Sequence, residues 1–194
     1  PRRRIASATR SGKKAEIANQ VEAQRLLDEA KKGSFGVSDV KTTRRKRKPP
    51  PPFITSTLQQ EAYKQIRFHA KKTMSVAQRL YEGLEIGERG LVGLVTYMRT
   101  DSVRISDEAL RQGREHISRT YAPEYLPPQP RTYKNKRKAQ DAHEAIRPTS
   151  FDLPPDVVKP FLDQDSLRLY TMIWNRFIAS QMSSARVEET GFDI

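Results

Sequence analysis

A chain of 194 residues with 36% hydrophobic content can bury one good core or two small ones. Its 36 Lys and Arg against 23 Asp and Glu leave a net charge of +13, which favours an anionic partner: nucleic acid, an acidic membrane surface or an acidic protein. The absence of cysteine excludes disulfides, thiolate zinc sites and a thiol nucleophile, and no apolar run approaches the roughly 18 residues of a membrane span or serves as a signal segment. The composition fits a soluble intracellular protein, and both ends read as cuts from a larger one.

The first clear element is an amphipathic helix over residues 19–33. Asn19 can cap it, Glu22 follows in capping-box position, and Gly33 ends it. Its apolar residues recur with helical spacing: Ala23, Leu26, Leu27 and Ala30. The pattern predicts a helix with one buried face.

A domain boundary is predicted after this helix. Residues 34–40 indicate a short strand, and "KTTRRKRKPPPP" then breaks all periodicity. The four prolines at 49–52 favour an extended polyproline segment. The basic residues of the stretch are Lys41, Arg44, Arg45, Lys46, Arg47 and Lys48. We expect a semi-rigid, positively charged connection between two domains.

Two helices joined by the turn "AKKT" at 70–73 are predicted next. A Thr57-x-x-Gln60 capping box begins the first, and the second covers 74–83 with Tyr81 on its apolar face. Such a pair is a helix-turn-helix candidate, but its spacing fits an ordinary helical hairpin equally well. A DNA-binding role and a purely structural role both stay open.

The remaining elements alternate between extended and helical segments. "LVTY" is extended up to Tyr97, and Ser106 caps a helix with an acidic first turn. "DAHEAIR" predicts a short helix over 141–147, and the longest helix covers 165–182 with a wide aromatic face. After Ser183 the chain is extended and is expected to pair with strands from its beginning.

Tyr97 and Arg99 form the first candidate site. A phenol with a pKa of about 10 is a poor nucleophile unless its anion is stabilised. On a strand, Tyr97 and Arg99 project to the same face and can reach one anionic group together, and a guanidinium suits a phosphodiester. The alternative is a half-buried strand tyrosine with a solvated arginine beside it.

His143 and Arg147 form the second candidate pair. One turn apart on the predicted helix, they would place an imidazole and a guanidinium on one face. For this motif in isolation, a surface histidine in a salt-bridged helix is the favoured interpretation. Tyrosine recombinases use similar residues but place the arginine and histidine before the tyrosine, which argues against that class.

Four stretches together carry a family resemblance. "GLVTYMRTDS", followed about forty residues later by "AHEAIRPT" and preceded by "PPFITSTLQQEA" and "KKTMSVAQRLYEG", resembles the type IA DNA topoisomerases, in their bacterial topoisomerase I branch. The residue between the tyrosine and the arginine is methionine, Met98, and a methionine at this position resembles the topoisomerase I branch. The resemblance covers nearly the whole chain.

The resemblance implies a role for each matching residue. Tyr97 would be the nucleophile that forms a 5′-phosphotyrosyl bond to one DNA strand, and Arg99 would stabilise charge on the scissile phosphate. His143 would contact that phosphate, and Arg147 would be a DNA or structural contact. The residues expected to position the tyrosine loop by hydrogen bonds are Thr96, Thr100, Asp101 and Ser102.

The resemblance also implies an architecture. The fold class would be α+β, mainly α, with a winged-helix-like domain over 50–183 and segments of a β-rich gate arch at 1–49 and 184–194. The partners would be single-stranded and negatively supercoiled DNA and the remaining domains of the parent enzyme, in the bacterial cytoplasm at the nucleoid. Mg²⁺ would bind an acidic cluster outside this chain, so the piece alone would be inactive or very weak. A non-catalytic winged-helix DNA-binding module and a basic protein-interaction domain remain the alternatives.

Overall fold

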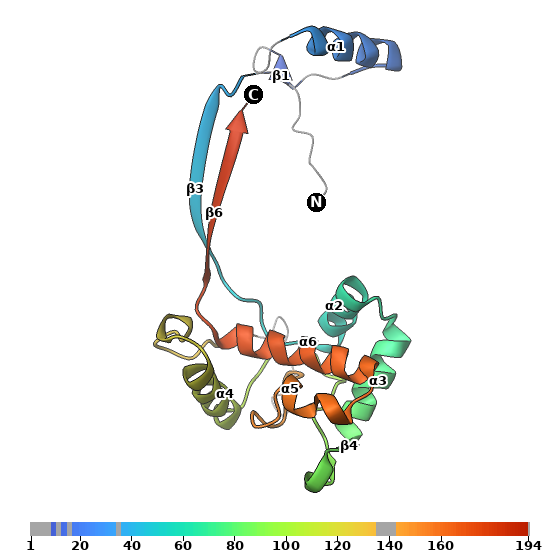
Figure 1. The fold of residues 1–194 in the computed structure, drawn as a ribbon, viewed down its shortest axis with the longest axis vertical. Helices are drawn as coiled ribbons and strands as arrows, with labels where there is room; N and C mark the ends of the chain where they lie inside the picture. The colour runs from blue at the N-terminus through green and yellow to red at the C-terminus, as the bar shows by residue number, and fades with distance from the viewer. Residues whose placement is uncertain (1–8, 11–12, 15–16, 34–35, 135–142, 194) are drawn as a thin grey trace. The chain divides into compact units, whose positions relative to one another are not determined.

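The computed structural model describes residues 9–10, 13–14, 17–33, 36–134 and 143–193. The chain divides into two compact units: a terminal unit of Pro1–Arg44 with Glu188–Ile194, and a helical unit of Arg45–Val187. Helices dominate and the strands are mostly short, so the predicted fold class, α+β and mainly α, is confirmed (Figure 1). None of the described helices has both the length and the apolarity to cross a membrane.

The terminal unit contains the first predicted helix, α1 (Gln20–Lys32), after a small antiparallel pairing of β1 (Thr9–Arg10) with β2 (Lys13–Lys14). Asn19 caps α1 through its side-chain oxygen, which accepts a hydrogen bond from the Glu22 amide at 2.9 Å. The helix is therefore confirmed, but its expected buried face is wrong for this chain. No residue of α1 is buried, because no described part of the chain covers its apolar stripe.

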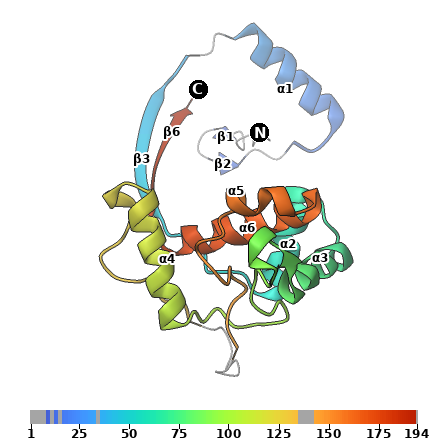
Figure 2. The ribbon, with the colours of Figure 1, turned by 60° about the horizontal axis from the view of Figure 1, so that its bottom comes forward.

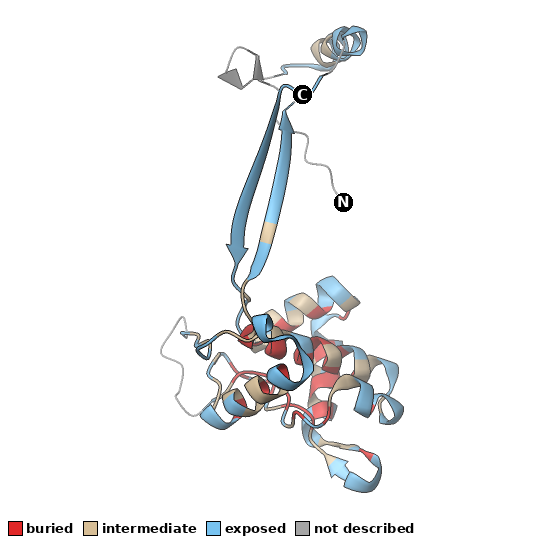
Figure 3. Cartoon of the chain, turned by 60° about the vertical axis from the view of Figure 1, so that its left-hand side comes forward, coloured by how far each residue is buried: buried red, intermediate tan, exposed pale blue. Residues whose placement is uncertain are grey.

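The basic stretch, which broke all periodicity in the sequence, lies in a strand except for Lys48. β3 (Asp39–Arg47) pairs with β6 (Ala185–Asp193). Of the strand predicted at 34–40, residues 39–40 begin β3, residues 36–38 are not in a strand, and residues 34–35 lie outside the described part of the chain. Thr42 faces Thr190 with 3.3 Å between their hydroxyl oxygens, and the Arg44 guanidinium contacts Glu188 at 2.6 Å. The carboxylates of β6 offset the charge repulsion within β3. The prediction that the last residues pair with an earlier strand is confirmed, and both strands are exposed along nearly their whole length (Figure 3).

The helical unit begins with α2 (Thr55–Ile66) and α3 (Ala70–Glu82). Both helices start earlier than predicted. Thr57 is the third residue of α2, and its hydroxyl accepts from the amide of Ile54, so the helix begins two residues before the expected cap. The expected "AKKT" turn is the first turn of α3, and the connection lies at residues 67–69, where Arg67 adopts a left-handed conformation with φ 60°.

A hairpin of β4 (Leu84–Glu85) and β5 (Leu91–Val92), with a 3₁₀ turn at Gly87–Arg89, follows the helix pair as in a winged-helix arrangement. The chain then forms α4 (Asp107–Thr120), the 3₁₀ turn Pro123–Tyr125, α5 (Pro155–Val158), the 3₁₀ turn Lys159–Phe161 and α6 (Gln164–Gln181). Ser106 accepts from the Ala109 amide, so the predicted cap of α4 is confirmed.

Helix α6 is the centre of the core. It packs against α2, α3, α4 and α5, and it runs between α4 on one side and the α2–α3 pair on the other (Figure 2). The predicted aromatic face is buried at Tyr170, Ile173, Trp174, Phe177 and Ile178. The Tyr170 hydroxyl, buried with this face, donates to the Leu153 carbonyl at 2.7 Å.

The helix predicted at "DAHEAIR" is wrong for residues 143–147, and residues 141–142 lie outside the described part of the chain. This segment is extended, with single β-bridges from Ile146 to Phe53 and from Pro148 to Val95. The amide of Ala145 donates to Arg104 O at 2.8 Å and that of Ile146 to Phe53 O at 2.8 Å. Because these amides bond to distant segments, they are not available for helical i to i−4 bonds. His143 and Arg147 are therefore not on one helix face.

Candidate active site

Tyr97 lies on an irregular loop between β5 and α4. Its neighbours Leu94, Val95 and Met98 are almost completely buried, whereas the Tyr97 side chain is 46% exposed. The extended segment predicted up to Tyr97 is limited to the bridge at Val95, and the backbone bends at residues 98–99. Buried apolar residues thus anchor the loop and leave the phenol at the surface.

Thr96 ties this loop to the extended segment that carries His143. Its amide donates to Arg147 O at 2.9 Å, and its hydroxyl donates to Ala145 O at 2.7 Å. The same hydroxyl accepts from the Arg147 amide at 3.0 Å. These bonds fix the backbone on the N-terminal side of Tyr97.

Thr100 and Ser102 fix the other side of the loop. The Thr55 hydroxyl accepts from the Thr100 amide at 2.9 Å and donates to Met98 O at 2.8 Å, while the Thr55 amide donates to Thr100 O at 2.9 Å. The Thr100 hydroxyl accepts from the Ser102 amide at 3.1 Å. The sequence interpretation assigned no role to Thr55, although this residue lies in the stretch "PPFITSTLQQEA" that contributes to the family resemblance.

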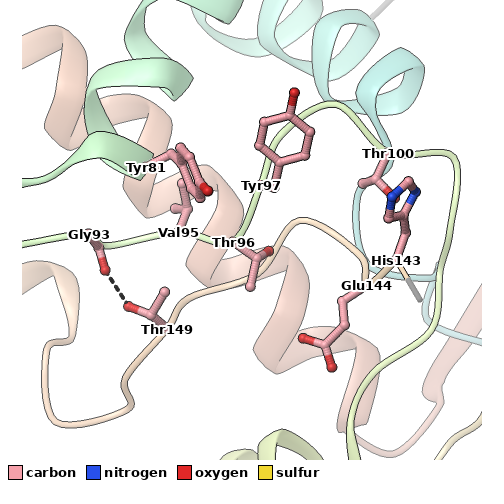
Figure 4. Close-up of a pocket in the computed structure, with 9 residues that line it drawn as sticks. All are labelled: Tyr81, Gly93, Val95, Thr96, Tyr97, Thr100, His143, Glu144 and Thr149. Atoms are coloured by element: carbon pink, nitrogen blue, oxygen red, sulfur yellow. Dashed lines mark hydrogen bonds between the residues drawn. The ribbon is translucent and has the colours of Figure 1, made fainter.

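Two adjoining cavities surround the loop. One of about 400 Å³ lies beside Tyr97, and its lining residues are Tyr81, Gly93, Val95, Thr96, Tyr97, Thr100, His143, Glu144 and Thr149 (Figure 4). A second of about 440 Å³ is lined by Ile54, Thr55, Ser56, Arg99, Thr100, Asp101 and His143. Tyr97 and Arg99 therefore border different cavities, and His143 and Thr100 line both.

Arg99, Asp101 and His143 are exposed, and their side chains form no hydrogen bond or ion pair within the part of the chain that the structure describes. A surface guanidinium and imidazole in this state are available to an anion from outside the protein. The Tyr97 loop thus has threonine hydroxyls that are bonded within the protein, and the exposed side chains of Arg99 and Asp101, which have no partner in the described part of the chain.

Arg147 is engaged inside the protein. Its Nε and Nη2 atoms contact Glu144 Oε2 at 3.0 and 2.5 Å, and its Nη1 donates to Pro148 O at 2.9 Å. Partial burial alone would raise the pKa of Glu144, but the Arg147 guanidinium, together with bonds from Ser106, lowers it below its ordinary value. Of the two roles left open for Arg147, this geometry favours the structural one.

Tyr81, the last but one residue of α3, is a site residue that the sequence interpretation assigned to the apolar face of a helix. Its ring lies 5.3 Å from that of Tyr97, at 64°, and its side chain is 41% exposed. Gly93 permits the backbone before Tyr97 to pass close to the end of α3, because a Cβ atom there would lie 2.6 Å from the backbone oxygen of Tyr81. Only the folded structure brings Tyr81 and Tyr97 together.

A sequence profile described as DNA topoisomerase matches residues 3–194. The chain belongs to this family. It is 50% identical over 173 residues to DNA topoisomerase 1 of Xylella fastidiosa, strain Temecula1, covering 89% of this chain and 21% of that protein. It is 47% identical over 177 residues to DNA topoisomerase 1 of Helicobacter pylori, strain ATCC 700392, covering 91% of this chain and 24% of the relative.

A solved topoisomerase shares the fold. The full-length topoisomerase I from Thermotoga maritima in a monoclinic crystal form superimposes with a TM-score of 0.73 at 39% identity, covering 95% of this chain and 28% of that one. The chain therefore spans about a quarter of the length of the topoisomerases that it matches.

The family resemblance implies Mg²⁺, with its ligands expected outside this chain. The described residues contain no group of three or more His, Cys, Asp and Glu side chains that could hold a metal ion. Glu144, the carboxylate residue that lines the cavity beside Tyr97, is already paired with Arg147. The described residues therefore do not form a metal site.

Proposed function

We propose that this chain is the tyrosine-bearing, strand-cleaving part of a type IA DNA topoisomerase. The supporting observation is Tyr97 itself: a half-exposed phenol on a loop that is bonded on both sides, beside a cavity that His143 also lines, in a chain of the topoisomerase family. In the parent enzyme, residues 50–183 would be the tyrosine domain, and residues 1–49 and 184–194 would be segments of the gate arch.

In the proposed reaction, Tyr97 Oη attacks a phosphorus atom of single-stranded DNA. A bond forms between Oη and phosphorus, the bond from phosphorus to the 3′ oxygen breaks, and the phenolic proton is lost while the 3′ oxygen gains one. The phosphate stays on the tyrosine as a 5′-phosphotyrosyl ester, which stores the bond energy. Resealing is the reverse attack and requires no ATP, and strand passage in between relaxes negative supercoils.

Arg99 and His143 would act on the phosphate. The Arg99 guanidinium would stabilise charge that develops on the phosphate oxygens, and the His143 imidazole would contact the same group. Asp101, exposed next to Arg99, would help to position the loop or its ligand, and Thr96, Thr100 and Ser102 would hold the loop through the bonds described above. Arg147 would keep the segment of His143 in place through Glu144.

The activity would need parts that lie outside these residues. The Mg²⁺ ligands and the remaining domains would come from the rest of the parent enzyme, so this chain alone should cleave DNA weakly or not at all. Its substrates would be single-stranded and negatively supercoiled DNA at the bacterial nucleoid.

Covalent trapping tests the proposal. The complete enzyme is incubated with labelled single-stranded DNA and denatured, and the DNA that stays attached to protein is measured. Tyr97→Phe should abolish the adduct, because it removes the attacking oxygen. Tyr121→Phe, a change at another exposed tyrosine on the far end of α4, should preserve it. An adduct that survives in Tyr97→Phe, or DNA binding with no adduct in the unsubstituted enzyme, would instead support a non-catalytic DNA-binding module.

Arg99→Ala tests whether the Arg99 guanidinium stabilises the charge that develops on the phosphate. If the guanidinium stabilises the transition state, single-turnover cleavage should slow by about two to three powers of ten, as for loss of one oxyanion donor. Arg89→Ala, on the β4–β5 turn, is the matched removal of a positive charge outside the loop. A loss confined to DNA affinity, with the cleavage rate of bound DNA unchanged, would make Arg99 a phosphate anchor only.

A further inference from the structure

The cavity beside Tyr97 has two chemically different sides. Tyr81, Gly93 and Thr149 lie on one side of Tyr97, and Thr100 and His143 lie on the other (Figure 4). The first side offers the aromatic ring of Tyr81, a residue that is 41% exposed, next to Val95. The second side offers an imidazole with no partner in the described part of the chain.

Three of the polar side chains that line the cavity are engaged within the protein. The Thr149 hydroxyl donates to Gly93 O at 2.6 Å, the Thr96 hydroxyl donates to Ala145 O, and the Glu144 carboxylate is paired with Arg147. A ligand on this side thus finds aromatic and apolar surface, with few groups free for hydrogen bonding. Stacking on such a surface is how proteins bind single-stranded nucleic acid without reading its sequence.

We infer that this cavity is a nucleobase subsite, in which the Tyr81 ring stacks against the base of a nucleotide next to the scissile phosphate. The inference rests on the proposed function, since it needs DNA at Tyr97. The phosphate then lies toward His143 and the base toward Tyr81. Because the Thr96 and Thr149 hydroxyls are bonded within the protein and stacking does not depend on the identity of the base, the subsite accepts any base and discriminates against a missing one.

A cycle of protein and DNA changes tests this in the complete enzyme. Tyr81→Leu removes the ring but keeps an apolar side chain at the helix end, and oligonucleotides with one abasic residue at each position around the cleavage site remove single bases. Adduct formation is measured at subsaturating DNA. Tyr81→Leu should lower adduct formation by about tenfold, the loss of one stacked base, and Tyr81→Phe should restore most of it.

The decisive result is whether the effects of Tyr81→Leu and of the abasic residue add when both are present. At the position whose base occupies the subsite, the abasic residue should weaken the unsubstituted enzyme by about tenfold but cause little further loss in Tyr81→Leu, because both changes remove the same contact. Exchanging a purine for a pyrimidine at that position should matter much less than removing the base. Tyr121→Leu, with 40% exposure against 41% for Tyr81, is the matched control and should show additive losses throughout.

Two outcomes overturn the subsite. If the losses add at every position, Tyr81 only supports Tyr97, and if Tyr81→Leu cleaves all substrates normally, the ring has no role. Either result leaves the proposed function intact as long as Tyr97→Phe abolishes the adduct. Failure of that separate control would remove the proposed function instead.

Discussion

Helices α1 and α6 have the same kind of sequence pattern, but only α6 is buried in a core. Both carry an apolar stripe and a side-chain cap, Asn19 in α1 and Asp163 in α6. Helix α6 buries ten residues, whereas α1 buries none. The difference shows that an amphipathic pattern specifies a helix locally, while burial requires a partner surface, which the helical unit supplies and the described terminal unit does not.

The largest expected effect is at the centre of α6. Phe177→Ala removes a side chain with 0% exposure and should destabilise the helical unit by about 3–5 kcal/mol. Leu27→Ala, the matching change on α1 at 48% exposure, should leave that unfolding transition and the helix content unchanged. Trp174, the single tryptophan, lies in the core of the helical unit, so its fluorescence during denaturant unfolding reports that unit.

Equal losses from the two substitutions would contradict the comparison, because they would mean that α1 packs as tightly as α6. Circular dichroism on the same samples distinguishes loss of packing from loss of helix.

The two units also contain similar ion pairs in different surroundings. The Arg147–Glu144 pair is 13% and 19% exposed, and the Arg44–Glu188 pair of the β3–β6 ribbon is 82% and 54% exposed. Arg147→Met should destabilise the helical unit by about 2–3 kcal/mol, because it leaves a mostly buried carboxylate without its cation. Arg44→Met should change thermal unfolding by less than calorimetry resolves, since exposed pairs contribute little.

The buried pair also predicts a pH dependence. The pKa of Glu144 lies below its ordinary value of 4.5 in the folded protein, so the stabilisation is present above that value and is lost as the pH falls through the folded-state pKa. Between about pH 6 and pH 3, the unsubstituted protein should therefore lose more stability than Glu144→Gln. If both proteins lose the same stability over this pH range, Glu144 is not the source of the pH dependence.

The smallest expected effect concerns two glycines. A Cβ atom at Gly113 of α4 would lie 2.7 Å from Cε1 of Phe177, whereas one at Gly191 of β6 meets nothing within 4 Å. Gly113→Ala should destabilise by about 1 kcal/mol, because overpacking outweighs the gain in helix propensity. Gly191→Ala should be close to neutral in thermal unfolding, and a stabilised Gly113→Ala would show that Phe177 can move aside.

Local chemistry explains which parts of the site were predictable. Ser106 caps α4 and Asn19 caps α1 because a cap needs only a side-chain oxygen and an amide three residues away. The spacing of the tyrosine motif led to Tyr97 in the same way, and the family to which the motif pointed is confirmed for the chain. The catalytic roles of Tyr97, Arg99 and His143 stay predictions.

Tertiary structure decided the conformation of the segments that bond to distant parts of the chain. The segment of His143 had a strong helical pattern, yet its amides bond to Arg104 and Phe53, so it is extended. Likewise, the basic run became a strand because β6 supplies partners about 144 to 152 residues away. No local signal could place Tyr81 beside Tyr97 or Thr55 against the loop. Both contacts depend on bonds between separate segments, such as that from the Leu94 amide to Leu80 O and that from the Thr55 amide to Thr100 O. By itself, then, the sequence determined the main helices, the family and the candidate nucleophile, because these depend on short-range patterns. The surroundings of that nucleophile required the folded core.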